Sequence, residues 1–320
     1  MGIYLNPNDE NFFDVVQSGR YVDKTMLIAA TNKMLGDPSY KFICVSRPRR
    51  FGKSMAGDML AAYYSKGAGS KNLFSEYKIS KTESFEKHLH TYNVIKIDLN
   101  ALYSQWKNIP VKQEEFKTVT GYLTTLLCNE FKAEFKDITF PKEQTVSGYL
   151  QQAYKETKEK FIIIIDEYDV LVREQVEQND FDLYLAFLVS LFKNSELKPA
   201  VALAYITGIL PVVKDKMQSK LNTFNEYTML EAEDFAEFTG FTAKEVRTLC
   251  QKYGCSFDEC KSWYDGYKVG NYEIYNPEAV IQAVPKGKFK SYWSKTSSYE
   301  VISDKIKMNF EGTKDCVIKM

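Results

Sequence analysis

Three consecutive residues, Gly52, Lys53 and Ser54, have the types and spacing needed to bind the phosphates of a nucleotide. They follow a short apolar segment and a basic turn, and they open a segment of helical character. The backbone N–H groups at a helix start lack partners within the helix, and the helix dipole favours an anion there. In a phosphate-binding loop, the lysine reaches the β- and γ-phosphates and the serine hydroxyl ligates Mg²⁺. The segment therefore predicts a site for ATP and Mg²⁺.

The loop departs from the general pattern of a phosphate-binding loop. The first glycine of G-x-x-x-x-G-K-S is replaced by Arg47. A bare Gly-Lys-Ser triplet also fits a glycine turn before a helix, with the lysine in solvent. The triplet alone leaves both interpretations open.

A second segment carries two carboxylates. Four consecutive isoleucines follow Phe161, and the run ends on Asp166 and Glu167. Such a β-branched run is typical of a strand buried on both faces of a parallel sheet, and ligands bind at the carboxyl ends of such strands. Asp166 is predicted to hold Mg²⁺ and Glu167 to polarise the attacking water as a general base. A polar turn after a buried strand would also explain Asp166, but together the two segments favour nucleotide binding.

The elements that must position these residues alternate between strands and helices. Strands are expected at Phe42–Val45, Tyr92–Leu99, Phe161–Ile165 and Ala200–Ile206, with helices near residues 53–64, 113–136, 145–158 and 181–193. This alternation predicts an α/β fold with a mostly parallel sheet flanked by helices. Thr207 ends the last of these strands. It either senses the γ-phosphate, as polar residues at this place do in ATPases with an additional strand, or caps a turn.

The stretches RPRRFGKS and IIIIDEYD resemble the AAA-ATPase-like family of bacterial P-loop NTPases. In that family an arginine stands where the first loop glycine is expected, so Arg47 agrees with the resemblance. Other matching segments are Tyr21–Ile28, Ile206–Val212, Leu221–Thr228 and Trp263–Val280. The resemblance implies nucleotide contacts along the whole loop: Arg47, Pro48, Arg49, Arg50, Phe51, Gly52, Lys53, Ser54 and Met55. Many relatives continue into a PD-(D/E)XK nuclease-like domain, of which this sequence shows no credible constellation.

The loop is strongly basic. Arg47, Arg49, Arg50 and Lys53 place four positive charges within seven residues. Burying them without anions would be costly, and phosphates meet that need. One arginine could stabilise the transition-state charge in cis. The alternative is a solvated basic turn.

The pattern changes after about residue 228, so we expect domains at residues 1–230 and 231–320. The second contains a capping box from Thr242 to Glu245 and a hairpin turn at Gly270-Asn271. Asn276-Pro277 is expected to start a helix. These features predict a small, mainly helical or winged-helix-like lid domain, with residues 305–320 as a truncated or frayed end.

Composition narrows the function classes. Lys plus Arg and Asp plus Glu each number 42, and this balance argues against a generic, strongly basic nucleic-acid binder. The six cysteines lack zinc-site spacing, and no apolar run approaches the length of a membrane span. The start of the chain lacks the features of a signal peptide. These observations predict a cytoplasmic protein with reduced thiols and no membrane partner.

The leading functional hypothesis is an ATPase that binds ATP and hydrolyses it slowly with Mg²⁺, as a regulated switch. Lys53, Glu167 and Thr207 are the predicted catalytic residues, and Ser54 and Asp166 are the predicted metal ligands. A second hypothesis is a nucleotide-binding signalling or scaffold module without turnover. A third, from the family resemblance alone, is the ATPase part of a nuclease-linked, nucleic-acid-processing system. A second copy of the chain or another protein is the expected partner.

Overall fold

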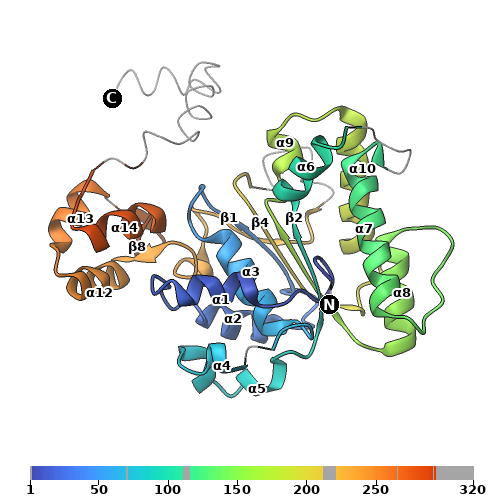
Figure 1. Cartoon of the computed structure of the whole chain (residues 1–320), viewed down its shortest axis with the longest axis horizontal. Helices are drawn as coiled ribbons and strands as arrows, with labels where there is room; N and C mark the ends of the chain where they lie inside the picture. The colour runs from blue at the N-terminus through green and yellow to red at the C-terminus, as the bar shows by residue number, and fades with distance from the viewer. Residues whose placement is uncertain are drawn as a thin grey trace. The chain divides into compact units, whose positions relative to one another are not determined.

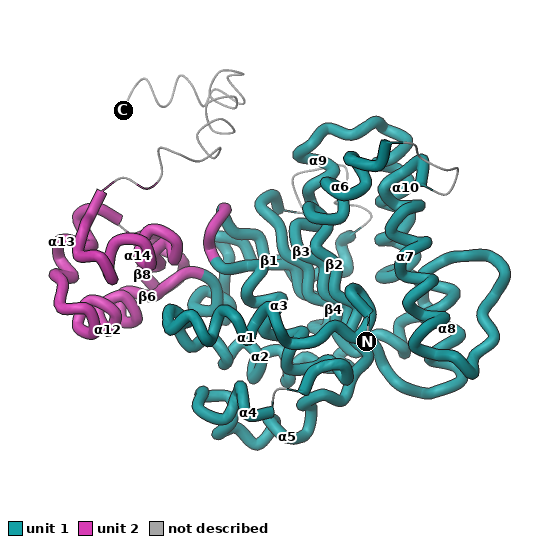
Figure 2. The backbone as a smooth tube through the Cα atoms, in the orientation of Figure 1, with its two compact units in different colours: residues 1–48, 52–239 teal, residues 49–51, 240–320 magenta. Residues whose placement is uncertain are grey.

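The computed structural model describes residues 2–69, 71–110, 116–211, 221–264, 266–290 and 292. It divides into two compact units, shown in separate colours in Figure 2. The first contains Met1–Pro48 and Gly52–Thr239, and the second contains Arg49–Phe51 and Gly240–Met320. The boundary thus falls between residues 239 and 240, where the sequence suggested 230 and 231. The middle of the basic loop is grouped with the second unit.

The first unit is built on a parallel five-stranded sheet. Its strands are β1 (Phe42–Ser46), β2 (Asn93–Asp98), β3 (Phe161–Asp166), β4 (Val201–Gly208) and β5 (Asn225–Tyr227). The order is β2-β3-β4-β1-β5, and each neighbouring pair runs parallel. The prediction of a mostly parallel sheet is therefore confirmed. β4 lies between the strand that precedes the loop and the strand that ends in Asp166.

Helices cover both faces of this sheet (Figure 1). One layer contains α1 (Glu10–Gln17), α2 (Met26–Met34) and α3 (Lys53–Tyr64), and the other contains α6 (Leu99–Lys107), α7 (Val119–Glu134), α8 (Val146–Thr157) and α10 (Gln178–Phe192). Ile162 and Ile164 pack in the first layer's core, and Ile163 and Ile165 in the second. Because successive strand residues point to opposite faces, the isoleucine run fills two separate cores.

The predicted elements differ from the structure mainly at their ends. α7 begins at Val119 after its N-cap Thr118, whereas residues 113–115 lie outside the described part. α6 was not predicted. The described part of the unit also contains the short helical segments α4 (Lys71–Phe74), η1 (Lys78–Lys81), α5 (Phe85–His88), α9 (Val170–Arg173) and η4 (Glu233–Phe235).

Gly208 ends β4 in a crowded place. A Cβ atom there would lie 2.6 Å from Cε1 of Tyr168 and 2.9 Å from Oδ1 of Asp169, and both neighbours are buried. We expect Gly208→Ala to lower the free energy of unfolding by about 1–3 kcal/mol, the usual cost of overpacking, in urea denaturation. Gly69→Ala is the control, because nothing lies within 4 Å of its added Cβ. Equal unfolding free energies for the two variants would contradict this account.

In its described residues, the second unit combines three α-helices with a small antiparallel sheet. The strands β6 (Phe241–Thr242), β7 (Tyr267–Val269) and β8 (Tyr272–Tyr275) have the order β6-β8-β7, and the helices are α12 (Ala243–Tyr253), α13 (Phe257–Trp263) and α14 (Pro277–Ala283), followed by η5 (Val284–Lys286). The capping box of Thr242 and Glu245 is present, and Gly270 has φ +58° in the turn between β7 and β8. Asn276 caps α14 by accepting from the Ala279 N–H. These three local predictions are confirmed, while residues 305–320 lie outside the described part.

Candidate nucleotide-binding site

The helix α3 begins as a phosphate-binding helix should. Gly52, its N-cap, has φ +80°, a left-handed conformation that glycine adopts with little strain. The carbonyl of Gly52 accepts from Ala56 N–H at 3.0 Å, so the helix is regular from its first turn. No side-chain hydrogen bond caps this helix start in the described structure. Its free N–H groups and its dipole therefore present a site for an anion.

Lys53 is buried, although lysine side chains are usually exposed. Only 6% of its surface is accessible, and its Nζ donates to the carbonyls of Arg47 and Pro48 at 3.0 Å each. Burial lowers the pKa of Lys53, while Asp166 and Glu167 oppose that shift. The lysine therefore lies within the loop and does not project into solvent.

The side chain of Arg47 is held within the protein, and its contact with a nucleotide stays a prediction. Its guanidinium is almost fully buried and donates to three main-chain carbonyls: Ser46 at 2.9 Å, Tyr227 at 2.7 Å and Phe235 at 3.5 Å. Burial lowers its pKa to about 10, so the side chain stays charged at neutral pH. The carbonyls supply the compensation that we had expected from phosphates, and Arg47 joins the ends of β1 and β5 to η4.

The other loop residues that were predicted to contact the nucleotide belong partly to the first compact unit and partly to the second. Arg49, Arg50 and Phe51 are grouped with the second unit, where the buried Phe51 ring lies 5.5 Å from that of Tyr267. Arg50 has φ +68°. Met55 is half-buried in α3. Contacts of these side chains with a nucleotide remain predictions.

Asp166 is held in place by a neighbouring strand. It is 3% exposed at the end of β3, and its Oδ1 accepts hydrogen bonds from the Thr207 hydroxyl and from Glu167 N–H. This arrangement leaves Oδ2 for a cation. Thr207 is fully buried in β4, so it acts on the site by orienting Asp166, a role that the sequence did not suggest.

Glu167 is engaged by an arginine. Its backbone has φ +53°, a left-handed conformation that is uncommon for glutamate, and its Oε2 pairs with Nη2 of Arg173. The Nε of Arg173 lies 3.3 Å from Oδ2 of Asp169, which also accepts from the N–H groups of Ile209 and Leu210. Sequence reasoning missed Asp169 and Arg173. Asp169 belongs to the same IIIIDEYD stretch, but only the fold shows what it binds.

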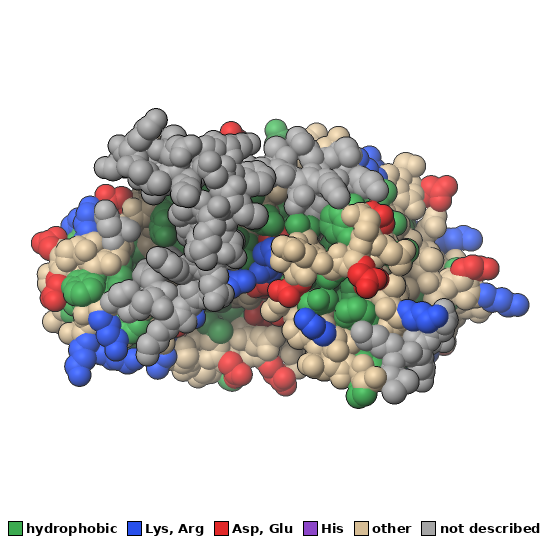
Figure 3. Space-filling model, turned by 90° about the horizontal axis from the view of Figure 1, so that it is seen from above, with side chains coloured by type: hydrophobic (Ala, Val, Ile, Leu, Met, Phe, Trp, Pro, Cys, Tyr) green, Lys and Arg blue, Asp and Glu red, His purple; other side chains and the backbone are tan. Residues whose placement is uncertain are grey.

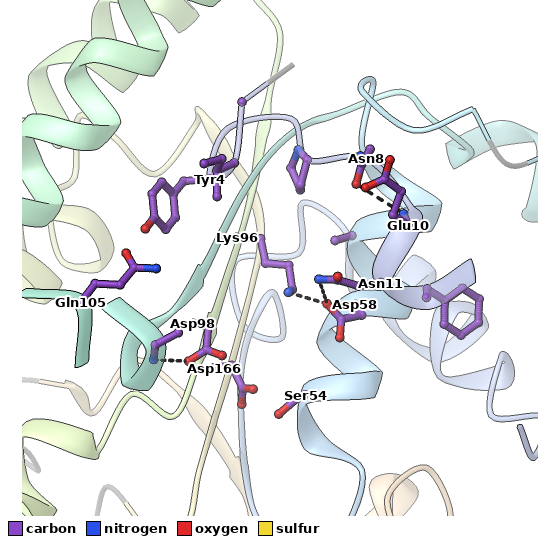
Figure 4. Close-up of a pocket in the computed structure, with 16 residues that line it drawn as sticks. Tyr4, Asn8, Glu10, Asn11, Ser54, Asp58, Lys96, Asp98, Gln105 and Asp166 are labelled. Atoms are coloured by element: carbon purple, nitrogen blue, oxygen red, sulfur yellow. Dashed lines mark hydrogen bonds and ion pairs between the residues drawn. The ribbon is translucent and has the colours of Figure 1, made fainter. Parts of the chain in front are cut away.

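A cavity of about 420 Å³ opens beside α3 and the ends of β2 and β3. Figure 4 shows Asp98 and Asp166 side by side on its wall, with Ser54 across from them. In the same cavity, Nζ of Lys96 pairs with Oδ1 of Asp58 at 2.5 Å. Neither Lys53 nor Glu167 is among the described residues that line it.

Asp98 was not predicted to belong to the site. Desolvation by the surrounding protein raises the pKa of this solvent-accessible carboxyl, as does the charge of Asp166, while the N–H of Ala101 and the charge of Lys96 lower it. A signal was available in the sequence, because the predicted strand Tyr92–Leu99 has an aspartate as its next-to-last residue, and the strand before Glu167 is also followed by an aspartate. The pairing of β2 with β3 brings those two strand ends together.

The residues at the cavity fit a magnesium–nucleotide complex. Mg²⁺ usually takes one or two protein oxygens, with phosphates and waters as its other ligands. The exposed Ser54 and the oriented Asp166 both line the cavity and supply such oxygens. Within the described ranges, no group of three or more His, Cys, Asp or Glu side chains could hold a metal ion.

The parallel sheet, the uncapped helix after Gly52 and the aspartate at the end of β3 define a P-loop nucleotide-binding fold. Over residues 10–218 the sequence matches the AAA-ATPase-like family, described as "Predicted AAA-ATPase". The chain belongs to this family.

Individual relatives are distant. The chain is 24% identical over 294 residues to the "Uncharacterized protein in vnfD 5'region" of Azotobacter chroococcum mcd 1, covering 89% of this chain and 52% of that protein. It thus spans about half the length of that relative. Two solved structures show limited likeness. C. elegans PCH-2 has a TM-score of 0.34 and 11% sequence identity, and the match covers 83% of this chain and 58% of that one. Drosophila ORC bound to DNA has a TM-score of 0.36 and 9% sequence identity, and the match covers 85% of this chain and 59% of that one.

The helices give no sign of a membrane span. Among the described residues, none forms a helix with the length and apolar character needed to cross a bilayer.

Proposed function

We propose that this protein binds ATP with Mg²⁺ and hydrolyses it slowly, as a switch that acts on a protein partner or a second copy of the chain. The observation that carries the proposal is the pairing of an uncapped helix start with a buried carboxylate that a neighbouring threonine orients. Gly52 and the buried Lys53 form the phosphate side, and Ser54 and Asp166 line the cavity beside it. Membership of the AAA-ATPase-like family supports nucleotide binding.

Each group has a separate task in this proposal. The N–H groups of α3 and the ammonium of Lys53 hold the phosphates. Ser54 and Asp166 would hold Mg²⁺, which neutralises charge on the β- and γ-phosphates when it is bound. Thr207 keeps Asp166 in place through its hydrogen bond. Arg47 stabilises the loop by donating hydrogen bonds to the main-chain carbonyls of Ser46 and Tyr227.

The ion pair of Glu167 and Arg173 supports slow turnover. The Glu167 oxygen that Arg173 holds must leave this ion pair before it can accept a hydrogen bond from a water. The same ion pair favours the second candidate function, a module that binds nucleotide without turnover. On the face shown in Figure 3, basic and acidic side chains of the described residues are interspersed, without the continuous basic surface typical of nucleic-acid binding.

ATP binding and phosphate release by the purified chain, with Mg²⁺ and with EDTA, test the proposal. Binding that is strengthened by Mg²⁺, with slow phosphate release, is expected. ATP binding without phosphate release would favour the second candidate, a module that binds nucleotide without turnover. A lack of ATP binding both with Mg²⁺ and with EDTA would contradict both candidate functions.

Asp166→Asn tests the metal site. Asparagine keeps the shape and can still accept from Thr207, but it removes the negative charge that attracts the cation. We expect the gain in ATP affinity on adding Mg²⁺ to fall by about 10-fold or more, measured by calorimetry. Asp137→Asn, at an exposed position, should keep the full gain. An unchanged Mg²⁺ effect in Asp166→Asn would remove Asp166 from the metal site.

A further inference from the structure

The residue predicted to act as the general base does not lie at the cavity. Glu167 is absent from the described lining, and its carboxylate is bound to Arg173. Hydrolysis needs a water held beside the γ-phosphate, on the side where Ser54 and Asp166 lie. The cavity has ample room, since its volume of about 420 Å³ far exceeds the roughly 30 Å³ that one water occupies. We therefore consider the acceptors that do line this space among the described residues.

Asp98 is the lining carboxylate that the fold places beside Asp166. It is the last residue of β2, and the parallel register pairs it with Asp166, the last residue of β3. Both line the cavity together with Ser54 (Figure 4). Asp98 is exposed to that space, whereas Asp166 is buried and already accepts from Thr207.

The side chain of Asp98 is also anchored. It caps the start of α6, where its Oδ1 accepts from Ala101 N–H at 2.9 Å. One oxygen is thus fixed by the helix, which leaves Oδ2 to accept from a ligand. A catalytic group held on a rigid element keeps its position between turnovers.

Other polar groups of the cavity are less suited to this task. Lys96 carries the wrong charge to accept a proton, and it is paired with Asp58. Asp58 is further engaged by Asn11, whose Nδ2 lies 3.3 Å from the same Oδ1.

We propose that Asp98 accepts a hydrogen bond from the attacking water and orients it toward the γ-phosphate, which makes Asp98 a catalytic residue. This proposal rests on the proposed hydrolysis of ATP. In the step, the water oxygen forms a bond to the γ-phosphorus. The bond between that phosphorus and the β–γ bridging oxygen breaks, and its electron pair leaves with ADP. The protons of the water pass to the product phosphate and to solvent.

Asp98→Asn is a sharp test because asparagine caps helices as well as aspartate does. The variant keeps α6 and the side-chain shape but loses the carboxylate. We expect kcat to fall by about 100-fold or more, with the Kd for ATP within about threefold of wild type. Asp98→Ser, which also retains a capping oxygen, should show the same split. Urea denaturation should give nearly unchanged stability for both, and Asp137→Asn should keep wild-type kinetics.

The outcomes separate this proposal from the function on which it rests. Wild-type turnover in both Asp98 variants, with turnover lost in Glu167→Gln, would overturn the role of Asp98 and leave ATP hydrolysis intact. Equal losses of ATP affinity and turnover in both Asp98 variants would also overturn it, because they indicate a binding role. Absence of turnover in the wild-type protein, with ATP still bound, would overturn both the hydrolysis and the role of Asp98.

Discussion

Lys53→Ala is expected to weaken ATP binding by about 100-fold. The ammonium lies in the loop at the start of α3, where it would bind the phosphates, and charged hydrogen bonds contribute about 1.5–3 kcal/mol. The substitution also removes a buried donor from the carbonyl of Arg47, so affinities are compared only after this variant and its control are shown to be folded. Calorimetry with a non-hydrolysable ATP analogue measures the effect.

Lys81→Ala is the matched control for this experiment. Lys81 is exposed in η1, so its loss should leave the affinity for the analogue unchanged. Circular dichroism should show that both variants are folded. A folded Lys53→Ala protein that binds the analogue as tightly as wild type would refute the assignment of the phosphate-binding loop.

Arg47→Met is expected to lower the free energy of unfolding by about 3 kcal/mol or more. Methionine fills part of the same space but donates no hydrogen bond, which leaves the buried carbonyls of Tyr227 and Phe235 without this donor. Each buried group left unsatisfied costs about 1–3 kcal/mol, more where the partner was charged. Urea denaturation of the variant and of wild type measures this decrease in the free energy of unfolding. Arg20→Met, at an exposed site, should unfold like wild type.

The same variant distinguishes two roles for Arg47. If Arg47 supports the loop, the Arg47→Met protein should unfold at a lower temperature than wild type. Below that temperature, while it is still folded, it should bind ATP. If it contacts phosphate, as its place in the loop suggested, Arg47→Met would unfold normally and bind ATP poorly. The second result would overturn the structural role given to the guanidinium here.

Local patterns predicted much of the fold because short-range physics decides them. The isoleucine run marks β3, Gly52 marks the start of α3, and Thr242 with Glu245 marks the start of α12. In each case the signal and its effect lie within a few residues. β5 escaped prediction because three residues, Asn225–Tyr227, carry too little periodicity to indicate a strand.

The site was predictable only where its residues belong to a local motif. Ser54 and Asp166 were selected in this way, and both line the cavity, while their roles as metal ligands stay predictions. The role of Arg47 depends on carbonyls of Tyr227 and Phe235, which lie far along the chain. The sequence marks Asp98 as a polar residue near a strand end, but its position beside Asp166 depends on the register between two strands, which that local pattern does not specify.

The strand order has a consequence for how the chain folds as it is made. β1, which leads into the loop, pairs with β4 and β5, and its register runs from Phe42 opposite Ala204 to Ser46 opposite Gly208. Strands β2, β3 and β4 can pair in the order of their synthesis, whereas β1 must wait for partners that emerge much later. Closing so long a loop is slow. The phosphate-binding loop is therefore completed late, and ATP, which stabilises only chains able to bind it, acts on the last stage of folding.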